Sequence, residues 1–214
     1  MKKNLVIYGA GGLGREVSAL LKALPEWQLT GYYDDGKTKG ENIGNVPVLG
    51  GMNELLSINE ETQVIIAIGN PRIKEALAIR MKTNSFIHFP VLIHPAAILQ
   101  DETTIELGEG TVITAGVIIT TQVQIGKHVL INLNATIGHD VEIGDCTSIM
   151  PGASIAGEVR IGNSVMIGSG SNILNGLRVA DQSIIGAGAV VTKDVAEGTT
   201  VVGVPARVIN TKSR

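Results

Sequence analysis

Aromatic residues are scarce in this chain of 214 residues, in which phenylalanine, tyrosine and tryptophan together make up 3%. The core therefore has to consist of aliphatic side chains, and hydrophobic residues do account for 44% of the sequence. There is one cysteine, Cys146, so no internal disulfide can form. A formal net charge of −3 and the lack of a basic cluster argue against a nucleic-acid-binding protein.

Long hydrophobic runs are also missing. The apolar run closest to the amino terminus, Leu5 to Tyr8 with Ala10 after it, is interrupted by Gly9 and is too short for a signal core or a membrane span. We therefore expect a cytoplasmic protein with no membrane span. Its length allows one large domain or two small ones.

The second half of the chain carries a regular repeat. A large aliphatic residue occupies every sixth position, and hexapeptide repeats are typical of a parallel β-helix. If three hexads complete one triangular turn, each coil takes about eighteen residues, and side chains about eighteen positions apart stack in columns. The repeated positions are Leu107, Ile113, Ile119, Ile125, Ile131, Ile137, Ile143, Ile149, Ile155, Ile161, Ile167, Ile173, Val179, Ile185 and Val191.

A weaker six-residue spacing precedes this stretch, at Ile87, Ile93, Leu99 and Ile105, in a phase two residues away from the later register. We interpret these residues as an entry segment and a first partial coil. The sequence thus predicts an α/β domain over residues 1–90, followed by an all-β helix with a carboxyl-terminal tail over residues 91–214.

The first domain has the pattern of a Rossmann-like half-domain, in which strands and helices alternate. The expected strands are Leu5–Tyr8, Gly31–Tyr33 and Val64–Ile68, and the expected helices are Arg15–Ala23 and Pro71–Met81. The first strand runs into Gly9–Gly14, a GxGxxG turn that lets a phosphate approach backbone amides at a helix start.

The carboxyl ends of these strands share one sheet edge, which is where ligands bind in open parallel sheets. Acidic side chains at the end of the second strand can accept hydrogen bonds from a ribose or a base. Alternatively, the glycines only turn the chain and the aspartates are solvated. The residues expected in this crevice are Gly11, Gly12, Leu13, Asp34, Asp35 and Gly69.

His139 is the candidate catalytic residue of the β-helix. It stands at the third hexad position, where a side chain should lie outside the coil, and Asp140 follows it. A nearby carboxylate can fix the imidazole tautomer and favour its protonated form, as a general base requires. Gly157 and Asn175 fall in the same column, and a glycine there would leave a groove open for an acyl donor. The competing interpretation is a surface His–Asp pair without function.

Two other chemistries receive less support. A three-histidine zinc site would need more imidazoles converging across a subunit face, so no metal site is expected. Cys146 and His128 share a column one coil apart, at a strand spacing of roughly 4.8 Å. A covalent acyl–cysteine route is therefore a minor alternative.

The hexads, the glycine-rich first domain, the His139–Asp140 pair and the closing segment Val202–Arg207 together resemble one family. The chain is similar over nearly its whole length to bacterial sugar acetyltransferases of the sialic acid O-acetyltransferase and bacillosamine-pathway N-acetyltransferase family. The resemblance implies a left-handed β-helix and a homotrimer with active sites between neighbouring subunits. It also implies that acetyl-CoA is the co-substrate, with no permanently bound cofactor, and that the acceptor is a sugar or nucleotide-linked sugar of surface glycan biosynthesis.

Residue roles follow from the same resemblance. His139 would be the general base, Asp140 would tune it, and Asn132 would contact the acceptor. The donor would lie along Ser148, Gly157, Ser169 and Ala187, and the acceptor's nucleotide along the glycine turn. Two residues depart from the family: Ser148 and Leu13 stand where characterised relatives carry histidines.

Two other functions remain open from the residues themselves. The GxGxxG turn with Asp34 would suit an NAD(P)- or nucleotide-binding protein whose β-helix only oligomerises. The coils would also suit a structural module with a vestigial nucleotide domain. The sequence does not choose between amine and hydroxyl acceptors, and it does not identify the sugar or its carrier.

Overall fold

The computed structural model describes residues 2–209, and they form two compact units. One holds residues 2–69 and 73–90, and the other holds residues 70–72 and 91–209. Among the described residues, no helix is both long and apolar enough to cross a membrane.

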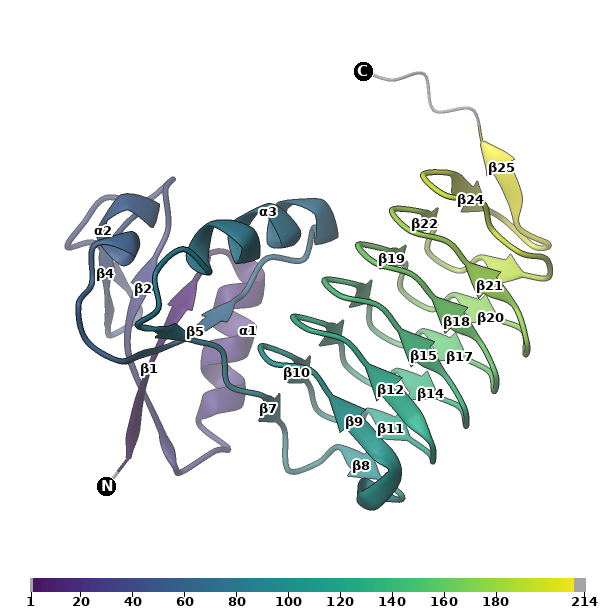
Figure 1. Ribbon diagram of the computed structural model, residues 1–214, viewed down its shortest axis with the longest axis horizontal. Helices are drawn as coiled ribbons and strands as arrows, with labels where there is room; N and C mark the ends of the chain where they lie inside the picture. The colour runs from purple at the N-terminus through teal and green to yellow at the C-terminus, as the bar shows by residue number, and fades with distance from the viewer. Residues whose placement is uncertain (1, 210–214) are drawn as a thin grey trace. The chain divides into compact units, whose positions relative to one another are not determined.

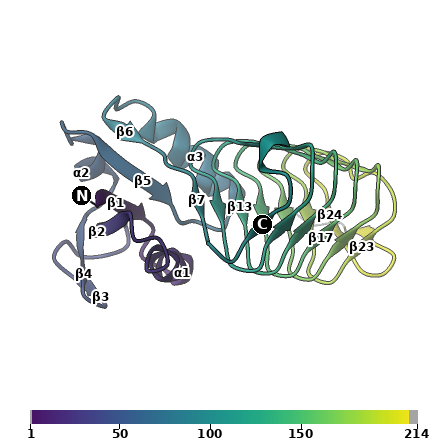
Figure 2. The ribbon, with the colours of Figure 1, turned by 90° about the horizontal axis from the view of Figure 1, so that it is seen from below.

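The first unit is a three-layer α/β arrangement around a six-stranded sheet with the order β3-β4-β2-β1-β5-β6. Only the β3–β4 pairing is antiparallel. Helix α1 covers one face of the sheet and α3 covers the other (Figure 2). The elements are β1 (Lys3–Tyr8), α1 (Gly12–Leu21), β2 (Trp27–Tyr33), β3 (Asn42–Ile43), β4 (Val46–Gly50), α2 (Met52–Leu56), β5 (Thr62–Ile66), α3 (Pro71–Met81) and β6 (Ile87–His88).

The three predicted strands and two predicted helices of this unit are present. The strands β1 and β5 each end in a continuous apolar run, as expected where helices cover both faces, and Leu5, Ile7 and Ile65 are fully buried. Helix α1 begins three residues before the predicted start, since Gly11 serves as its N-cap in an extended conformation. The short elements β3, β4, α2 and β6 were not predicted, because they are too short to show a period.

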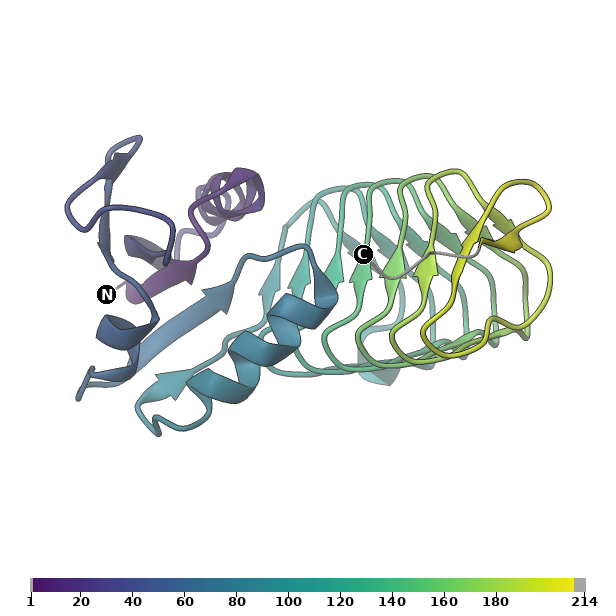
Figure 3. The same cartoon turned by 90° about the horizontal axis from the view of Figure 1, so that it is seen from above.

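The described residues of the second unit form three parallel sheets, which we name the first, second and third walls. Figure 1 and Figure 3 show their strands stacked coil upon coil. The first wall holds β7 (Leu92–Ile93), β10 (Val112–Ile113), β13 (Leu130–Ile131), β16 (Ser148–Ile149), β19 (Met166–Ile167), β22 (Ile184–Ile185) and β24 (Thr200–Val202). The second wall holds β8 (Ile98–Leu99), β11 (Ile118–Ile119), β14 (Thr136–Ile137), β17 (Ser154–Ile155), β20 (Asn172–Ile173) and β23 (Val190–Val191). The third wall holds β9 (Ile105–Leu107), β12 (Val123–Ile125), β15 (Glu142–Ile143), β18 (Arg160–Ile161) and β21 (Arg178–Val179).

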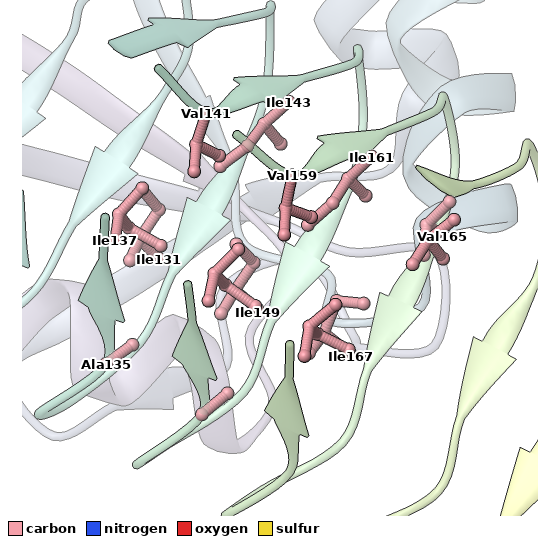
Figure 4. Packing of buried hydrophobic residues seen from close by; sticks show 14 of the residues in the cluster. Ile131, Ala135, Ile137, Val141, Ile143, Ile149, Val159, Ile161, Val165 and Ile167 are labelled. Atoms are coloured by element: carbon pink, nitrogen blue, oxygen red, sulfur yellow. The ribbon is translucent and has the colours of Figure 1, made fainter. Parts of the chain in front are cut away.

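The predicted aliphatic positions form the core of this β-helix. Fourteen of the fifteen are buried, and Leu107 in the first coil is partly buried. Ile137 pairs with Ile155, and Ile155 with Ile173, so side chains eighteen residues apart stack as expected. Figure 4 shows part of this core, with Ile137, Ile149 and Ile167 among the buried side chains that lie between the walls. Each burial contributes about 1.5–3 kcal/mol, which identifies these residues as scaffold.

The change of phase before Leu107 has a local cause. Ile93 and Leu99 pair with Ile113 and Ile119, twenty residues on, whereas Leu107 pairs with Ile125, eighteen residues on. The two additional residues are accommodated by the 3₁₀ turn η1 (Glu102–Thr104). The assignment of Ile87 to this series was wrong, because it lies in β6 and pairs with β5.

The last coil ends in a reversal of the chain. Strand β24 pairs in parallel with β22, and β25 (Arg207–Ile209) then pairs with β24 in the antiparallel direction. Antiparallel pairing occurs here after the Val204–Pro205 bond, which is cis. Strand β24, the last parallel strand of the first wall, is thus one arm of this hairpin.

Candidate active site

The turn that carries His139 and Asp140 joins β14 to β15, at the corner between the second and third walls. Gly138 donates its N–H to the Ile155 carbonyl at 2.8 Å, and the His139 carbonyl accepts from the Glu158 N–H at 2.8 Å. Asp140 has a φ of 58°, in the left-handed region that lets the chain turn onto the third wall. The next coil therefore holds the backbone beneath the histidine in place.

His139 and Asp140 form a hydrogen-bonded pair on the surface. The Nδ1 atom of His139 lies 2.7 Å from Oδ2 of Asp140, and the two side chains are 57% and 48% exposed. A carboxylate that accepts from Nδ1–H leaves Nε2 with a lone pair. The pair is therefore arranged so that Nε2 can take a proton from a bound acceptor.

Gly157 lies directly under the imidazole. A Cβ atom at residue 157 would be 2.5 Å from Nε2 and 2.6 Å from Cε1 of His139, closer than any side chain tolerates. The prediction that these residues share a column is thus confirmed by geometry. The space beside Gly157 holds the edge of the imidazole, whereas we expected an open groove there.

Backbone N–H groups at this corner are available to a ligand. Within residues 2–209, the amides of His139 and Gly157 donate no hydrogen bond. The corner between the third and first walls differs, because there three amides at the same hexad position donate to a side chain of the next coil. Those bonds run from Lys127 to Asp145 (2.7 Å), from Asp145 to Asn163 (2.8 Å) and from Asn163 to Asp181 (2.9 Å).

A shallow concavity of about 570 Å³ opens beside Asp140 on the third wall. Its charges are mixed, with carboxylates and guanidinium groups facing each other, and Arg160 Nε lies 3.4 Å from Glu142 Oε1. The mixture gives no preference for an anion or a cation. The lining residues are Asp140, Glu142, Glu158, Arg160, Gly176, Leu177 and Arg178.

The other predicted donor and acceptor residues of the β-helix lie apart from His139. Asn132, Ser169 and Ala187 are at the corner between the first and second walls, so the two groups flank opposite edges of the second wall. Asn132 is buried, and its Oδ1 accepts the Leu133 N–H at 2.8 Å. Ser148 lies in β16 of the first wall and is fully buried, so its side chain does not line the His139 corner.

The glycine turn of the first unit contains two kinds of glycine: some have no room for a side chain, and others have free space beside them. Gly9 has a φ of 105°, and a side chain on Gly14 would collide with the Gly9 carbonyl, so packing requires both. A Cβ at Gly11, Gly12 or Gly69 would meet nothing within 4 Å. Packing therefore leaves the backbone at these three positions open to a ligand. Leu13, which stands between Gly12 and Gly14 in the sequence, is half-buried.

Asp34 and Asp35 take part in the structure of the strand ends, contrary to the interpretation of free, solvated carboxylates. Asp34 accepts the Ala10 N–H at 2.7 Å and the Gly36 N–H at 2.8 Å, which ties the glycine turn to the end of β2. Asp35 accepts the Met52 N–H at 2.7 Å and the Tyr8 hydroxyl at 2.8 Å. These donors hold the pKa of the Asp35 carboxyl below its ordinary value, the Met52 amide most strongly.

Tyr8 and Gly138 belong to these sites although the sequence analysis assigned them no role. Burial, with the acceptor Asp35, raises the pKa of the Tyr8 hydroxyl above its ordinary range, so Tyr8 acts as a donor that holds Asp35. Its one sequence signal is a hydroxyl on the last residue of a buried strand. A Cβ on Gly138 would be 2.6 Å from the Gly157 nitrogen, so Gly138 sets the spacing of the coils under His139.

The geometry gives no support to the two alternative chemistries, a covalent acyl–cysteine route and a three-histidine zinc site. His128 and Cys146 are 3% and 4% exposed, so neither the imidazole nor the thiol is open to a substrate. Within the described part of the chain, no three histidine, cysteine or carboxylate side chains are grouped as metal ligands would be.

Comparison with known proteins agrees with this two-part organisation. Residues 4–81 match the PglD N-terminal domain, and residues 158–193 match the bacterial transferase hexapeptide family. The UDP-N-acetylbacillosamine N-acetyltransferase of Bacillus subtilis (strain 168) is 34% identical over 116 residues, which cover 53% of this chain and 52% of that relative.

Solved structures match the chain over almost its full length. The acetyltransferase domain of PglB from Neisseria gonorrhoeae FA1090, in complex with acetyl coenzyme A, has a TM-score of 0.89 and 31% identity, covering 98% of this chain and 100% of that one. PerB from Caulobacter crescentus, in complex with CoA and GDP-perosamine, has a TM-score of 0.89 and 28% identity, covering 97% and 98%. The left-handed winding expected from the family resemblance is confirmed by these likenesses. Because they span both the amino-terminal domain and the hexapeptide coils, the chain belongs to the PglD-like family of hexapeptide-repeat sugar acetyltransferases.

Proposed function

We propose that this protein transfers the acetyl group of acetyl-CoA directly to an amino or hydroxyl group of a nucleotide-linked sugar, with His139 as general base. The observation that carries the proposal is the pair at the corner between the second and third walls, where Asp140 holds Nδ1 of His139 at 2.7 Å and leaves Nε2 available. The relatives favour an amine as the acceptor, since the Bacillus subtilis relative is named an N-acetyltransferase.

The reaction moves one acyl group and one proton. The acceptor nitrogen or oxygen attacks the thioester carbonyl while Nε2 of His139 takes the proton of the acceptor. The C–S bond then breaks, the acetyl group stays on the sugar, and the proton on His139 passes to the CoA thiolate. Charge develops on the thioester oxygen during the attack. Gly157 lies under the imidazole and its N–H donates no hydrogen bond within residues 2–209, so this N–H is suited to stabilise that charge.

We assign the nucleotide of the acceptor to the first unit, along Gly11, Gly12, Leu13, Asp34, Asp35 and Gly69. The backbone at the three glycines is unobstructed, which supports the approach of a phosphate. Asp34 and Asp35 keep their structural hydrogen bonds in this proposal, and each carboxylate has further lone pairs that can accept from a ligand. PerB, the relative solved with CoA and GDP-perosamine, supports a nucleotide-linked acceptor.

We also propose that the protein is a homotrimer whose sites lie between subunits. His139 and Gly157 lie on one edge of the second wall, while Asn132, Ser169 and Ala187 lie on the other edge, with the strands of that wall between them. Neighbouring β-helices packed side by side would bring the two edges together. Three exposed apolar side chains lie in this wall or at its edges, Ile98 (53%), Leu133 (40%) and Leu174 (47%), as expected of a surface that another copy covers.

The test is His139→Ala in the full-length protein, assayed by thiol release from acetyl-CoA with a panel of nucleotide-linked amino sugars and their hydroxyl analogues. Loss of general-base assistance should lower turnover by about 10²–10⁴-fold. Circular dichroism and light scattering should show an unchanged fold and trimer. Near-normal turnover in the variant would end the assignment of His139.

The same assay separates acetyl transfer from the other functions. Titration with NAD, a nucleotide sugar and acetyl-CoA should show binding of the last two ligands and none of NAD. Tight NAD binding without a response to acetyl-CoA would favour a pyridine-nucleotide protein. Thiol release at background level with every acceptor would favour a purely structural module.

A further inference from the structure

The His139 imidazole extends toward the following coil. The third-position side chains at the corner between the third and first walls point the opposite way. At the corner between the third and first walls, third-position side chains fold back on the coil before them: Asp145 lies against Gly126 and Asp181 against Gly162, where a Cβ would collide with their carboxylates. At the corner between the second and third walls, the corresponding space between coils holds the edge of the imidazole, whose Nε2 and Cε1 lie over Gly157.

We propose that Gly157 is a positioning residue, which sets the orientation of the His139 imidazole by having no side chain. The inference rests on the proposed function and deepens it. Any side chain at residue 157 would start with a Cβ only 2.5 Å from Nε2, so the ring would have to leave its present place. The role is distinct from the direct contact with acetyl-CoA that the family resemblance implies for Gly157.

The geometry connects the ring position with the reaction. In its observed place the imidazole keeps Nδ1 on Asp140 and puts Nε2 over Gly157, whose amide donates no hydrogen bond within residues 2–209. A ring turned away from Gly157 separates the proton acceptor from this donor. Misplacement of a catalytic group by about 1 Å costs on the order of 10²-fold in rate.

Gly157→Ala tests the proposal cleanly, because it should move the ring and leave the fold intact. The atoms that a Cβ would meet belong to the free end of a side chain that is 57% exposed, and alanine keeps the backbone N–H. We expect a Tm within about 2 °C of the parent protein. We expect kcat to fall by about 10²-fold, with KM for acetyl-CoA changed by less than about twofold.

A double-mutant cycle with His139→Ala identifies the route of the effect. If Gly157 acts through the imidazole, Gly157→Ala causes no further loss of kcat once that ring is gone. A loss of the same factor in the His139→Ala background, or a raised KM for acetyl-CoA with kcat intact, would overturn the proposal in favour of a direct donor contact. Gly198→Asn is the matched control, since residue 198 has a φ of 66° and open space around it, and asparagine tolerates that backbone conformation.

A measurement without substrate keeps this proposal separable from the proposed function. Long-range ¹H–¹⁵N correlation spectra report the hydrogen bond at His139 Nδ1, and its signals should change in Gly157→Ala and stay unchanged in Gly198→Asn. Unchanged His139 signals in Gly157→Ala would contradict the positioning role. Normal turnover in His139→Ala would instead contradict the assignment of the base, whatever the spectra show.

Discussion

Gly138→Ala should destabilise the protein, whereas Gly157→Ala should not, although both replace a glycine at the same corner. A Cβ on Gly138 would be 2.6 Å from the Gly157 nitrogen and 2.8 Å from the Ala156 carbonyl carbon, both backbone atoms. That backbone cannot move alone, because Gly138 N–H bonds Ile155 O at 2.8 Å and Ala156 N–H bonds Ile173 O at 3.0 Å. Adjacent coils would have to separate by several tenths of an ångström to restore ordinary contact.

The magnitude follows from overpacking in a rigid structure, which costs about 1–3 kcal/mol. Both substitutions also restrict the unfolded chain, which contributes about 0.4–1 kcal/mol in the opposite direction. This contribution cancels when the variants are compared with each other, so the free energies of unfolding should differ by about 1–3 kcal/mol.

Urea denaturation followed by circular dichroism, with a common m-value, measures the difference between the variants. The parent protein and Gly198→Asn provide the references. Equal losses of stability in Gly138→Ala and Gly157→Ala would refute the reasoning, since they would mean that the imidazole is as immovable as the backbone of a neighbouring coil.

Two further predictions concern the aspartates that hold functional groups. Asp140→Asn keeps the left-handed turn and removes the charged acceptor from Nδ1, so kcat should fall by about tenfold, less than in His139→Ala; an unchanged kcat in steady-state assays would contradict a role for the carboxylate. The folded pKa of Asp35 is lowered, so its contribution to stability is complete above its unfolded pKa and is lost as the pH falls through the folded pKa. Asp35→Asn should therefore cost about 1 kcal/mol at neutral pH, after allowance for exposure, and should flatten the acid limb of a Tm-versus-pH series; a parallel limb would contradict this.

The sequence alone determined the β-helix, because an aliphatic residue at every sixth position is typical of a parallel β-helix, whose coils bury nearly all of these side chains. Ile137, Ile155 and Ile173 stack in the structure as the spacing predicts. Once the coil length is known, the columns follow, and the placement of Gly157 next to His139 is a consequence of counting. In the first unit, the order of strand, glycine turn, helix and acid was enough to predict a parallel sheet edge.

Tertiary structure decided what each side chain does at those places. No periodicity shows that the imidazole extends toward Gly157, that Asp34 and Asp35 are engaged by Ala10 and Met52, or that Ser148 is buried. The physical reason is that a repeat specifies which residues are neighbours through the rise and pitch of the backbone. The direction of a polar side chain depends instead on rotamers, hydrogen-bond donors and free space contributed by residues distant in the chain.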